Sequence, residues 1–310
     1  MLISNLISDS YEMNIGTPQG SVLAPLLFLL FVNDLSLPGV TIKYADDTSV
    51  AISAENEDDL QEKIKQICEE MSKWCFKNCL ILNEEKTVRV HFYKAYPKAN
   101  IENNAPAVKF LGTYLDAESS WETQIDHLCK KQNSAFFALL KLRYSVPITT
   151  LITSYYALVY PHLSYNIILW GQAVNIGGVF VAQKRIIRLI FGIKVPTSCK
   201  EFFIENKLLN LTCIYILKCS MYVFKYKQKF KQLAHNHSYA TRHGTNLLYP
   251  RHTTTRYEKS PYYSCVRIFN HLPKVIRDET EANKFRKQLK EYLFANAFYT
   301  FKEFMDKSTI

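Results

Sequence analysis

The hydrophobic periodicity of this chain changes near residue 116, and that change constrains its fold more than any other feature. Before Asp116, short β-rich segments alternate with amphipathic stretches, as at 41–53 and 58–78. An apolar helix is also expected at 21–35 and a strand at 88–93. After Asp116, apolar residues recur at helical spacing through most of the chain, beginning with a capping box at Ser119 and Glu122. Helices are expected at 149–170 with a bend at Pro161, in a stretch that ends near Gly192, and at 281–298. The pattern therefore predicts an α/β (α+β) N-terminal region followed by a mainly α-helical region, with a domain boundary near 116.

The charge of the chain changes at the same place. The 310 residues carry a formal charge of +10, but residues 1–116 hold 10 basic and 16 acidic side chains, whereas residues 117–310 hold 28 and 12. An acidic head could hold cations and a basic tail could hold a polyanion. The hydrophobic content of 48%, with only 9 Gly and 11 Pro, excludes collagen-like and intrinsically disordered classes.

A pair of aspartates lies between the two β-rich arms of segment 41–53. The arms predict a hairpin with Asp46 and Asp47 at its tip. Adjacent carboxylates repel each other strongly, and a divalent cation removes that repulsion. Oxygen ligands of this kind suit Mg²⁺. Taken alone, however, Asp-Asp in a turn is more often a solvated loop than a metal site.

The neighbours of this pair, in their order and spacing, carry a resemblance. GTPQGSVLAPLLF (16–28), NDL (33–35) and YADD (44–47) resemble the B and C motifs of reverse transcriptases from non-LTR (LINE-type, jockey-like) retrotransposons. Downstream, LNEEKT (82–87) resembles the D motif and FLG (110–112) the E motif, or primer grip. The basic half also resembles the region that follows the polymerase in arthropod elements of this class, at 183–190, 250–263 and 269–277.

The resemblance implies a partial right-hand polymerase palm at 1–116, a helical thumb at 117–175, and a basic, mostly helical C-terminal region at 176–310. The implied reaction is RNA-templated addition of deoxynucleoside triphosphates to a primer 3′ hydroxyl, with two Mg²⁺ ions as cofactors and an RNA template and a DNA primer as partners. Protein partners are not indicated.

The resemblance also implies roles for individual residues. Asp46 and Asp47 are expected to be catalytic and to bind metal, with Lys86 as a candidate general acid toward pyrophosphate. The residues expected to contact template, nucleotide or primer are Pro18, Gln19, Gly20, Tyr44, Phe110, Leu111 and Gly112. Simpler explanations exist for three of these groups: a turn before a helix for 18–20, a solvated surface lysine for Lys86, and a hairpin packed on the core for 110–112.

One motif of the family is not found. The A motif, a strand whose aspartate supplies a third metal carboxylate, normally lies several dozen residues before the B motif, but only fifteen residues precede Gly16. Asp9 and Glu12 are the acids in range, and Asp9 lacks the Ala-Phe-Asp setting. We therefore expect an N-terminally truncated enzyme, through decay of the element or a start inside a longer reading frame, and little polymerase activity from this polypeptide alone.

The basic half predicts contact with nucleic acid. Lysines alternate with aromatic residues at 221–231, and arginines and tyrosines gather at 249–263. Cations contact phosphates and rings can stack on unpaired bases. The predicted binding residues are Lys225, Lys227, Lys229, Lys231, Arg251 and Arg256. An amphipathic helix with a solvated lysine face and a tyrosine-rich core is the alternative for 221–231.

Other features exclude several classes of protein. The eight cysteines form no CxxC pair, which favours free thiols in a reducing compartment and no zinc site. The N-terminus is a poor signal peptide, and the apolar run 22–32 is too short to cross a bilayer. We therefore expect an intracellular protein, nuclear or cytoplasmic, without a membrane span. Besides the polymerase, a non-catalytic nucleic-acid-binding remnant and an unexpressed or unstable fragment stay open.

Overall fold

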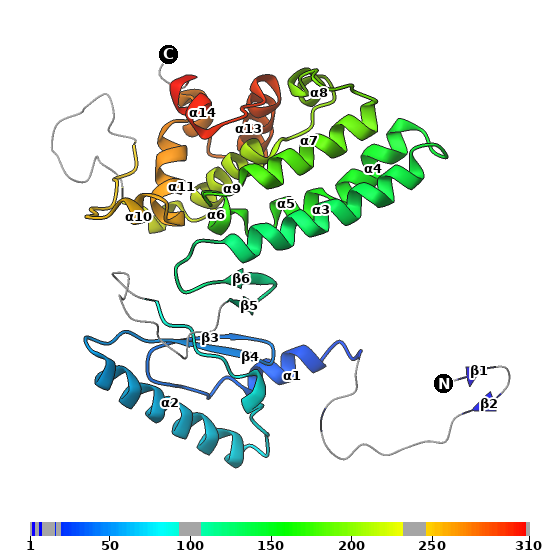
Figure 1. The fold of residues 1–310 in the computed structure, drawn as a ribbon. Helices are drawn as coiled ribbons and strands as arrows, with labels where there is room; N and C mark the ends of the chain where they lie inside the picture. The colour runs from blue at the N-terminus through cyan, green and yellow to red at the C-terminus, as the bar shows by residue number, and fades with distance from the viewer. Residues whose placement is uncertain are drawn as a thin grey trace. The chain divides into compact units, whose positions relative to one another are not determined.

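The structure, a computed structural model, describes residues 2–3, 6–7, 16, 20–92, 107–231 and 246–307 (Figure 1). Contacts within the chain divide it into two compact units, Met1–Thr87 and Val88–Ile310. The first unit is α/β and the second is mainly helical, which agrees with the coarse prediction of an α/β region before a helical one.

The first unit contains small sheets and helices. Its elements are β1 (Leu2–Ile3), β2 (Leu6–Ile7), α1 (Ala24–Phe31), β3 (Val40–Tyr44), β4 (Asp47–Ala51), α2 (Glu57–Lys77) and the 3₁₀ turn η1 (Glu84–Lys86). β1 pairs with β2, and β3 pairs with β4, each in an antiparallel ladder. The predicted hairpin at 41–53 is therefore confirmed.

Helix α2 follows the amphipathic pattern of the sequence. Asn56 caps it, because its side-chain oxygen accepts a hydrogen bond from the Asp59 amide at 2.8 Å. Its first turn contains three acidic residues, whose negative charges stabilise the helix by interacting with the positive end of its dipole. Trp74, near the other end, donates from Nε1 to the Asp34 carboxylate at 3.1 Å, and its ring lies 6.0 Å from that of Phe31. These contacts join α2 to the segment around α1.

The second unit begins with a hairpin and continues as helices (Figure 1). Its elements are β5 (Val108–Phe110), β6 (Thr113–Leu115), α3 (Glu122–Leu142), α4 (Ile148–Leu158), α5 (Tyr160–Ser164), α6 (Ile167–Trp170), α7 (Gly177–Phe191), α8 (Lys200–Glu205), α9 (Leu211–Lys225), η2 (Lys227–Lys229), α10 (Thr255–Glu258), α11 (Pro261–Asn270), α12 (Lys274–Arg277), α13 (Ala282–Asn296) and α14 (Phe301–Lys307). One hydrophobic core runs through these helices, and its largest fully buried side chains include Trp170, Tyr155 and Phe203.

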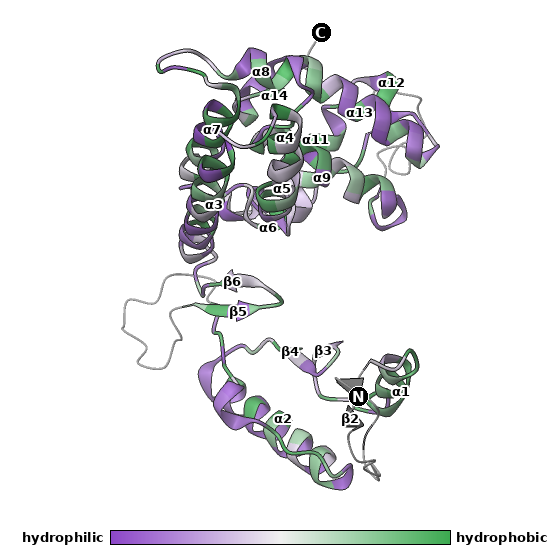
Figure 2. Cartoon of the chain, turned by 90° about the vertical axis from the view of Figure 1, so that its right-hand side faces the viewer, coloured by the Kyte–Doolittle hydropathy of each residue, from purple (hydrophilic) through white to green (hydrophobic). Residues whose placement is uncertain are grey.

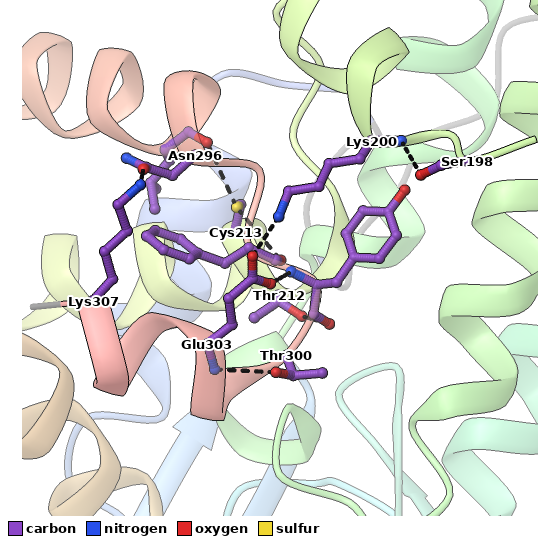
Figure 3. Close-up of polar contacts among 11 residues, drawn as sticks. Ser198, Lys200, Thr212, Cys213, Asn296, Thr300, Glu303 and Lys307 are labelled. Atoms are coloured by element: carbon purple, nitrogen blue, oxygen red, sulfur yellow. Dashed lines mark hydrogen bonds and ion pairs between the residues drawn. The ribbon is translucent and has the colours of Figure 1, made fainter.

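The last helix is held to the unit by polar contacts (Figure 3). The Glu303 carboxylate forms an ion pair with Lys200, at the start of α8, and accepts a hydrogen bond from the Tyr299 amide at 2.7 Å. The Thr212 hydroxyl on α9 donates to the Tyr299 carbonyl at 3.0 Å. Helix α14 is thus connected to α8 and α9.

Several boundaries were predicted correctly. The helical stretch 149–170 is broken near Pro161, where α4 ends and α5 begins, because proline lacks the amide proton that a continuous helix needs. Helix α7 ends at Gly192, which adopts a positive φ of 68°. The helix predicted at 281–298 is present as α13.

Three local predictions were wrong. A strand was expected at 88–93, but residues 88–92 form none, and strand propensity alone is insufficient without a pairing partner. The helix expected at 21–35 covers only Ala24–Phe31. A capping box was expected from Ser119 and Glu122, but α3 has no side-chain cap; Asp116 instead accepts hydrogen bonds from the Ser120 and Trp121 amides, just before the helix, at 2.7 and 2.8 Å.

The boundary between the two compact units lies after Thr87, whereas the sequence predicts a domain boundary near 116. Hairpin β5–β6 belongs to the helical unit, whereas the sequence pattern places the end of the palm at 116. The segments predicted as thumb and C-terminal region also share one core, since α3, α4 and α7 pack together and α6 packs on α9. The division into palm, thumb and C-terminal region therefore stays a prediction about function.

Candidate functional site

The two predicted metal ligands lie at the tip of hairpin β3–β4. Tyr44 pairs with Asp47, so Ala45 and Asp46 form a two-residue turn. Ala45 has a φ of 52°, in the left-handed region that a non-glycine residue adopts only at a cost. Asp46 and Asp47 are both exposed, and the Tyr44 ring is 65% exposed. The turn therefore presents two adjacent carboxylates and an aromatic ring to solvent.

Lys43 joins the segment after α1 to this hairpin, a role that no sequence pattern indicated. Its ammonium donates hydrogen bonds to the carbonyls of Val32, Asn33 and Leu35 at 2.8, 3.2 and 3.0 Å. These carbonyls follow the end of α1, where backbone acceptors lack helical partners and a cation is favourable. One side chain next to the acidic turn thus holds the NDL segment in place.

The B-motif residues are described only in part. Pro18 and Gln19 lie outside the described residues, so their predicted contacts with template or nucleotide stay predictions. Gly20 is exposed with a φ of 82°, a conformation that suits glycine, and a Cβ there would meet no atom within 4 Å. The backbone at Gly20 is thus open to close approach, as the prediction requires.

Helix α1, which follows, exposes its apolar side chains. None of its residues is buried, and Figure 2 shows it as one of the hydrophobic segments. The exposed members, with the residues just before them, are Val22, Leu23, Leu26, Leu27, Leu29, Leu30 and Phe31. Val40 and Ile42 on β3 are also more than half exposed. Apolar surface of this extent marks a face that binds another polypeptide segment or ligand.

Lys86 lies in the 3₁₀ turn η1. The Asn83 side chain caps this turn by accepting a hydrogen bond from the Lys86 amide at 3.1 Å. The lysine is exposed, and its ammonium makes no hydrogen bond or ion pair with any residue that the structure describes. The two predicted roles of Lys86, as a general acid or as a solvated surface lysine, therefore stay predictions.

The predicted primer grip forms a tight turn. Leu111 and Gly112, with φ values of 43° and 80°, link β5 to β6, the pattern of a two-residue hairpin turn. The Tyr165 hydroxyl donates to the Leu111 carbonyl at 2.6 Å, and the Asn166 amide donates to the Thr113 hydroxyl at 2.8 Å. Phe110 is half-buried and Gly112 is exposed. The hairpin is thus anchored to the helical unit by Tyr165 and Asn166, whose part the sequence did not indicate.

The acidic turn fits part of a magnesium site. Two carboxylates are hard oxygen donors of the kind that Mg²⁺ prefers. Within the described ranges, no cluster of three or more His, Cys, Asp or Glu side chains is arranged to hold a metal ion. Asp46 and Asp47 would therefore be two of the ligands, with further ligands coming from other groups.

The two basic segments of the second unit, far apart in sequence, meet in space. The Phe230 and Tyr262 rings stack with centroids 4.8 Å apart and an interplanar angle of 20°. The Tyr262 hydroxyl donates to the Lys229 carbonyl at 3.4 Å, and the Leu248 amide donates to the Lys231 carbonyl at 2.7 Å. We call the residues at 222–231 and 249–263 the tyrosine–lysine surface.

This surface is strongly positive. It carries seven lysine and arginine side chains but one acid, Glu258, which lies 3.1 Å from His252 Nε2. The ammonium groups of Lys225 and Lys229 lie over the Tyr226 ring, 5.2 and 4.9 Å from its centroid. The predicted binding residues Lys225, Lys227, Lys229, Lys231, Arg251 and Arg256 are all exposed. Arg256 donates one hydrogen bond, to the Glu118 carbonyl.

The motif at 183–190 has a structural role. Gln183 is fully buried, and its amide donates to the Tyr155 hydroxyl at 2.8 Å and to the Leu209 carbonyl at 3.0 Å, while its oxygen accepts from the Leu211 amide at 2.8 Å. The motif's apolar residues Ile186, Ile187, Leu189 and Ile190 are buried in the core. Gln183 thus joins α4, α7 and α9 through one satisfied polar group.

All eight cysteines are free thiols. Burial raises the pKa of Cys213 to about 12 and that of Cys219 well above its ordinary value. These buried thiols are therefore protonated at neutral pH and are poor metal ligands and nucleophiles. Histidines are the other common metal ligands of this region, and His235, His237 and His243 lie outside the described residues.

In the parts of the chain that the structure describes, no helix has both the length and the apolar character needed to cross a membrane.

Comparison with known proteins shows which family part of the chain is similar to. Residues 3–115 match the family described as reverse transcriptase (RNA-dependent DNA polymerase). The chain is 27% identical over 223 residues to the probable RNA-directed DNA polymerase from transposon X-element of Drosophila melanogaster, an alignment that covers 66% of this chain and 24% of that protein. It is 25% identical over 199 residues to the RNA-directed DNA polymerase from mobile element jockey of Drosophila funebris, covering 57% of this chain and 22% of that protein.

The chain spans less than a quarter of the length of each of these relatives. No solved structure matches it significantly. The family match begins before the acidic turn and ends with hairpin β5–β6, so it contains each of the four motifs quoted from the sequence. Residues 3–115 thus match the reverse transcriptase (RNA-dependent DNA polymerase) family, and the similarity to the polymerases of these Drosophila transposons supports a LINE-type reverse transcriptase.

Proposed function

We propose that this chain is a segment of an RNA-directed DNA polymerase in which Asp46 and Asp47 bind the catalytic Mg²⁺ ions. The observation that supports this most strongly is the two-residue turn of β3–β4, which presents both carboxylates to solvent within the family match. Lys43 stabilises the position of the turn relative to the NDL segment through three carbonyls. The arrangement suits binding of a hard cation together with substrate phosphates.

The reaction would join a primer to an incoming nucleotide. The primer 3′ hydroxyl oxygen attacks the α-phosphate of a deoxynucleoside triphosphate in line, a new phosphodiester bond forms, and pyrophosphate leaves. Two Mg²⁺ ions, when bound, would activate that hydroxyl and stabilise the charge on the leaving group. Asp46 and Asp47 would hold these ions at the hairpin tip, the proton of the primer hydroxyl would pass to water, and Lys86 would donate a proton to the pyrophosphate.

The remaining predicted residues would position the substrates. Tyr44, beside the aspartates, would pack near the primer end, and Gly20 would let a template base or nucleotide approach the backbone. The turn at 110–112 would place the primer strand, since Tyr165 and Asn166 hold it in one conformation. The template would be RNA and the primer DNA, as the family description implies.

The tyrosine–lysine surface also supports a second candidate function, a non-catalytic nucleic-acid-binding remnant of a retroelement. This surface is assembled within the described residues, whereas the acidic turn supplies only two carboxylates. Binding of nucleic acid by this surface would be retained whether or not the catalytic centre can be completed. Separate measurements of nucleic-acid binding and of catalysis can therefore distinguish the two functions.

The 310-residue chain alone is expected to show no RNA-templated primer extension above background. Loss of one of three metal carboxylates removes transition-state stabilisation of several kcal/mol, which corresponds to a rate about 10³-fold lower or more. The measurement is Mg²⁺-dependent incorporation of labelled nucleotide by the purified chain and by its Asp46→Ala variant. Robust incorporation that disappears in Asp46→Ala would contradict the expected incompleteness.

Binding of structured RNA is expected to weaken steeply with salt. Each phosphate neutralised by a cation adds about −0.7 to −0.9 to the slope of log affinity against log salt. Changing Lys225, Lys227, Lys229 and Lys231 together to Gln should make the slope about 3 to 4 units shallower if each contacts a phosphate. Lys65→Gln with Lys73→Gln, exposed on α2, is the matched control and should leave it unchanged. Salt-insensitive or absent binding would count against the nucleic-acid role.

A further inference from the structure

Three exposed tyrosines lie near one another on the tyrosine–lysine surface. Tyr222 on α9, Tyr257 on α10 and Tyr262 on α11 are each 38% exposed. The Tyr262 and Tyr222 rings both contact the Phe230 ring, and the Tyr257 ring lies 6.5 Å from that of Tyr263, the neighbour of Tyr262 in the chain. Residues from three helices thus contribute to one aromatic row.

Contacts with the rings of Phe230 and His252 hold these three tyrosines in place. The buried Phe230 ring stacks on Tyr262 and lies edge-on to Tyr222, with centroids 4.8 and 6.3 Å apart. His252 stacks on Tyr257 at 6.0 Å with an interplanar angle of 17°. Rings fixed in this way lose little conformational entropy when a ligand stacks on them.

The row is bordered by cations. Lys225 and Lys227 follow Tyr222 along the chain, and Arg256 and Lys259 flank Tyr257. None of these four side chains forms an ion pair with a carboxylate among the residues that the structure describes. These four positive charges are therefore available to bind a ligand. A ligand that carries both negative groups and flat aromatic groups would match the cations and the tyrosine rings.

Single-stranded nucleic acid has this chemistry. Its bases present open faces that stack on aromatic side chains independently of sequence, while its phosphates contact lysine and arginine. A duplex offers the phosphates but keeps its bases stacked on one another. The combination of exposed rings and unpaired cations on one surface therefore favours a single strand over a duplex.

We propose that Tyr222, Tyr257 and Tyr262 form a stacking platform for unpaired bases of single-stranded nucleic acid. Lys225, Lys227 and Arg256 contact the phosphates beside it. This platform rests on the proposed nucleic-acid role of the second unit and specifies the form of ligand that the unit holds. It makes the helical unit a holder of unpaired template or of a displaced strand.

The test compares three ligands of equal length, bound to the full chain and followed by fluorescence anisotropy. They are a 12-nucleotide oligothymidine, its abasic counterpart with the same phosphates, and a 12-base-pair duplex; an oligouridine of the same length separates RNA from DNA. The variants change Tyr222, Tyr257 and Tyr262 together to Leu or together to Phe. Tyr144→Leu, an 84% exposed tyrosine elsewhere in the unit, is the matched control. Thermal unfolding of each variant verifies the fold.

Stacking contributes about 1–3 kcal/mol per base, so each tyrosine lost should weaken oligothymidine binding about fivefold or more. The triple Leu variant should therefore bind oligothymidine at least 100-fold more weakly, while the triple Phe and Tyr144→Leu variants bind it nearly as the native chain does. Abasic binding should change little in any variant.

Different failures have different meanings. Equal oligothymidine affinity in the native and triple Leu proteins, or equal affinity of the native protein for oligothymidine and the abasic strand, overturns the stacking platform but leaves salt-dependent polyanion binding intact. Tighter binding of the duplex than of the single strand also overturns it. Absence of binding to all the ligands overturns the proposed nucleic-acid role together with the platform.

Discussion

Gln183→Leu is expected to destabilise the helical unit by about 3–5 kcal/mol. The substitution leaves three buried groups without their partner: the Tyr155 hydroxyl, the Leu209 carbonyl and the Leu211 amide. Each buried polar group that loses its hydrogen bond costs about 1–3 kcal/mol. Because these groups come from α4, from the residues just before α9, and from α9 itself, the loss affects the packing of three parts of the core.

Gln132 provides a matched control. Like Gln183 it is a buried glutamine with 0% exposure, but neither polar atom of its amide has a hydrogen-bond partner among the described residues. Gln132→Leu removes an unsatisfied amide from the core, so it should be neutral or stabilising by about 1–2 kcal/mol. Urea unfolding of the two variants measures both effects. Equal changes in the free energy of unfolding would contradict the role of the Gln183 network.

The acidic hairpin and helix α2 could be predicted because their signals are local. Alternating β-rich residues around Asp46 and Asp47 predict a hairpin, and the apolar stripe that ends at Trp74 predicts α2. Both are present with nearly the expected bounds. The exposed acidic tip therefore follows from residues within about ten positions of it.

Other parts of the candidate site depend on contacts that no local pattern reveals. Lys43 interacts with carbonyls that precede it by eight to eleven positions, and Tyr165 reaches Leu111 across 54 positions. The turn before α3 also differs from the expected Ser119 capping box, since Asp116 accepts hydrogen bonds from the Ser120 and Trp121 amides and the helix has no side-chain cap. Such pairings depend on the fold as a whole and cannot be read from spacing.

The segment 221–231 shows a mixed outcome. Helix α9 ends at Lys225, so the lysines at 227–231 follow it in a 3₁₀ turn instead of lining one face of a helix. Phe230 is buried, as the alternative of a core contribution expected, but Tyr222 is exposed. The stack of Phe230 on Tyr262 joins segments 32 positions apart, which explains why the sequence identified two basic segments but not one surface.

Asp46→Ala is expected to have the largest effect on catalysis. Because we predict little activity from the chain alone, residues 3–115 should replace the matching segment of the X-element polymerase for this measurement. In that chimera, losing one metal carboxylate should lower the rate of RNA-templated DNA synthesis by about 10³-fold or more. Asp58→Ala, an exposed acid in the first turn of α2, should leave the rate within about twofold.

The measurement that tests the central claim most directly is RNA-templated primer extension by this chimera and by its Asp46→Ala variant, at equal concentration and with the fold verified by thermal unfolding. The acidic turn of β3–β4 is predicted to support Mg²⁺-dependent synthesis that falls about 10³-fold or more in Asp46→Ala. A folded chimera without synthesis, or a chimera whose rate is the same with Asp46 and with Ala at this position, would contradict it.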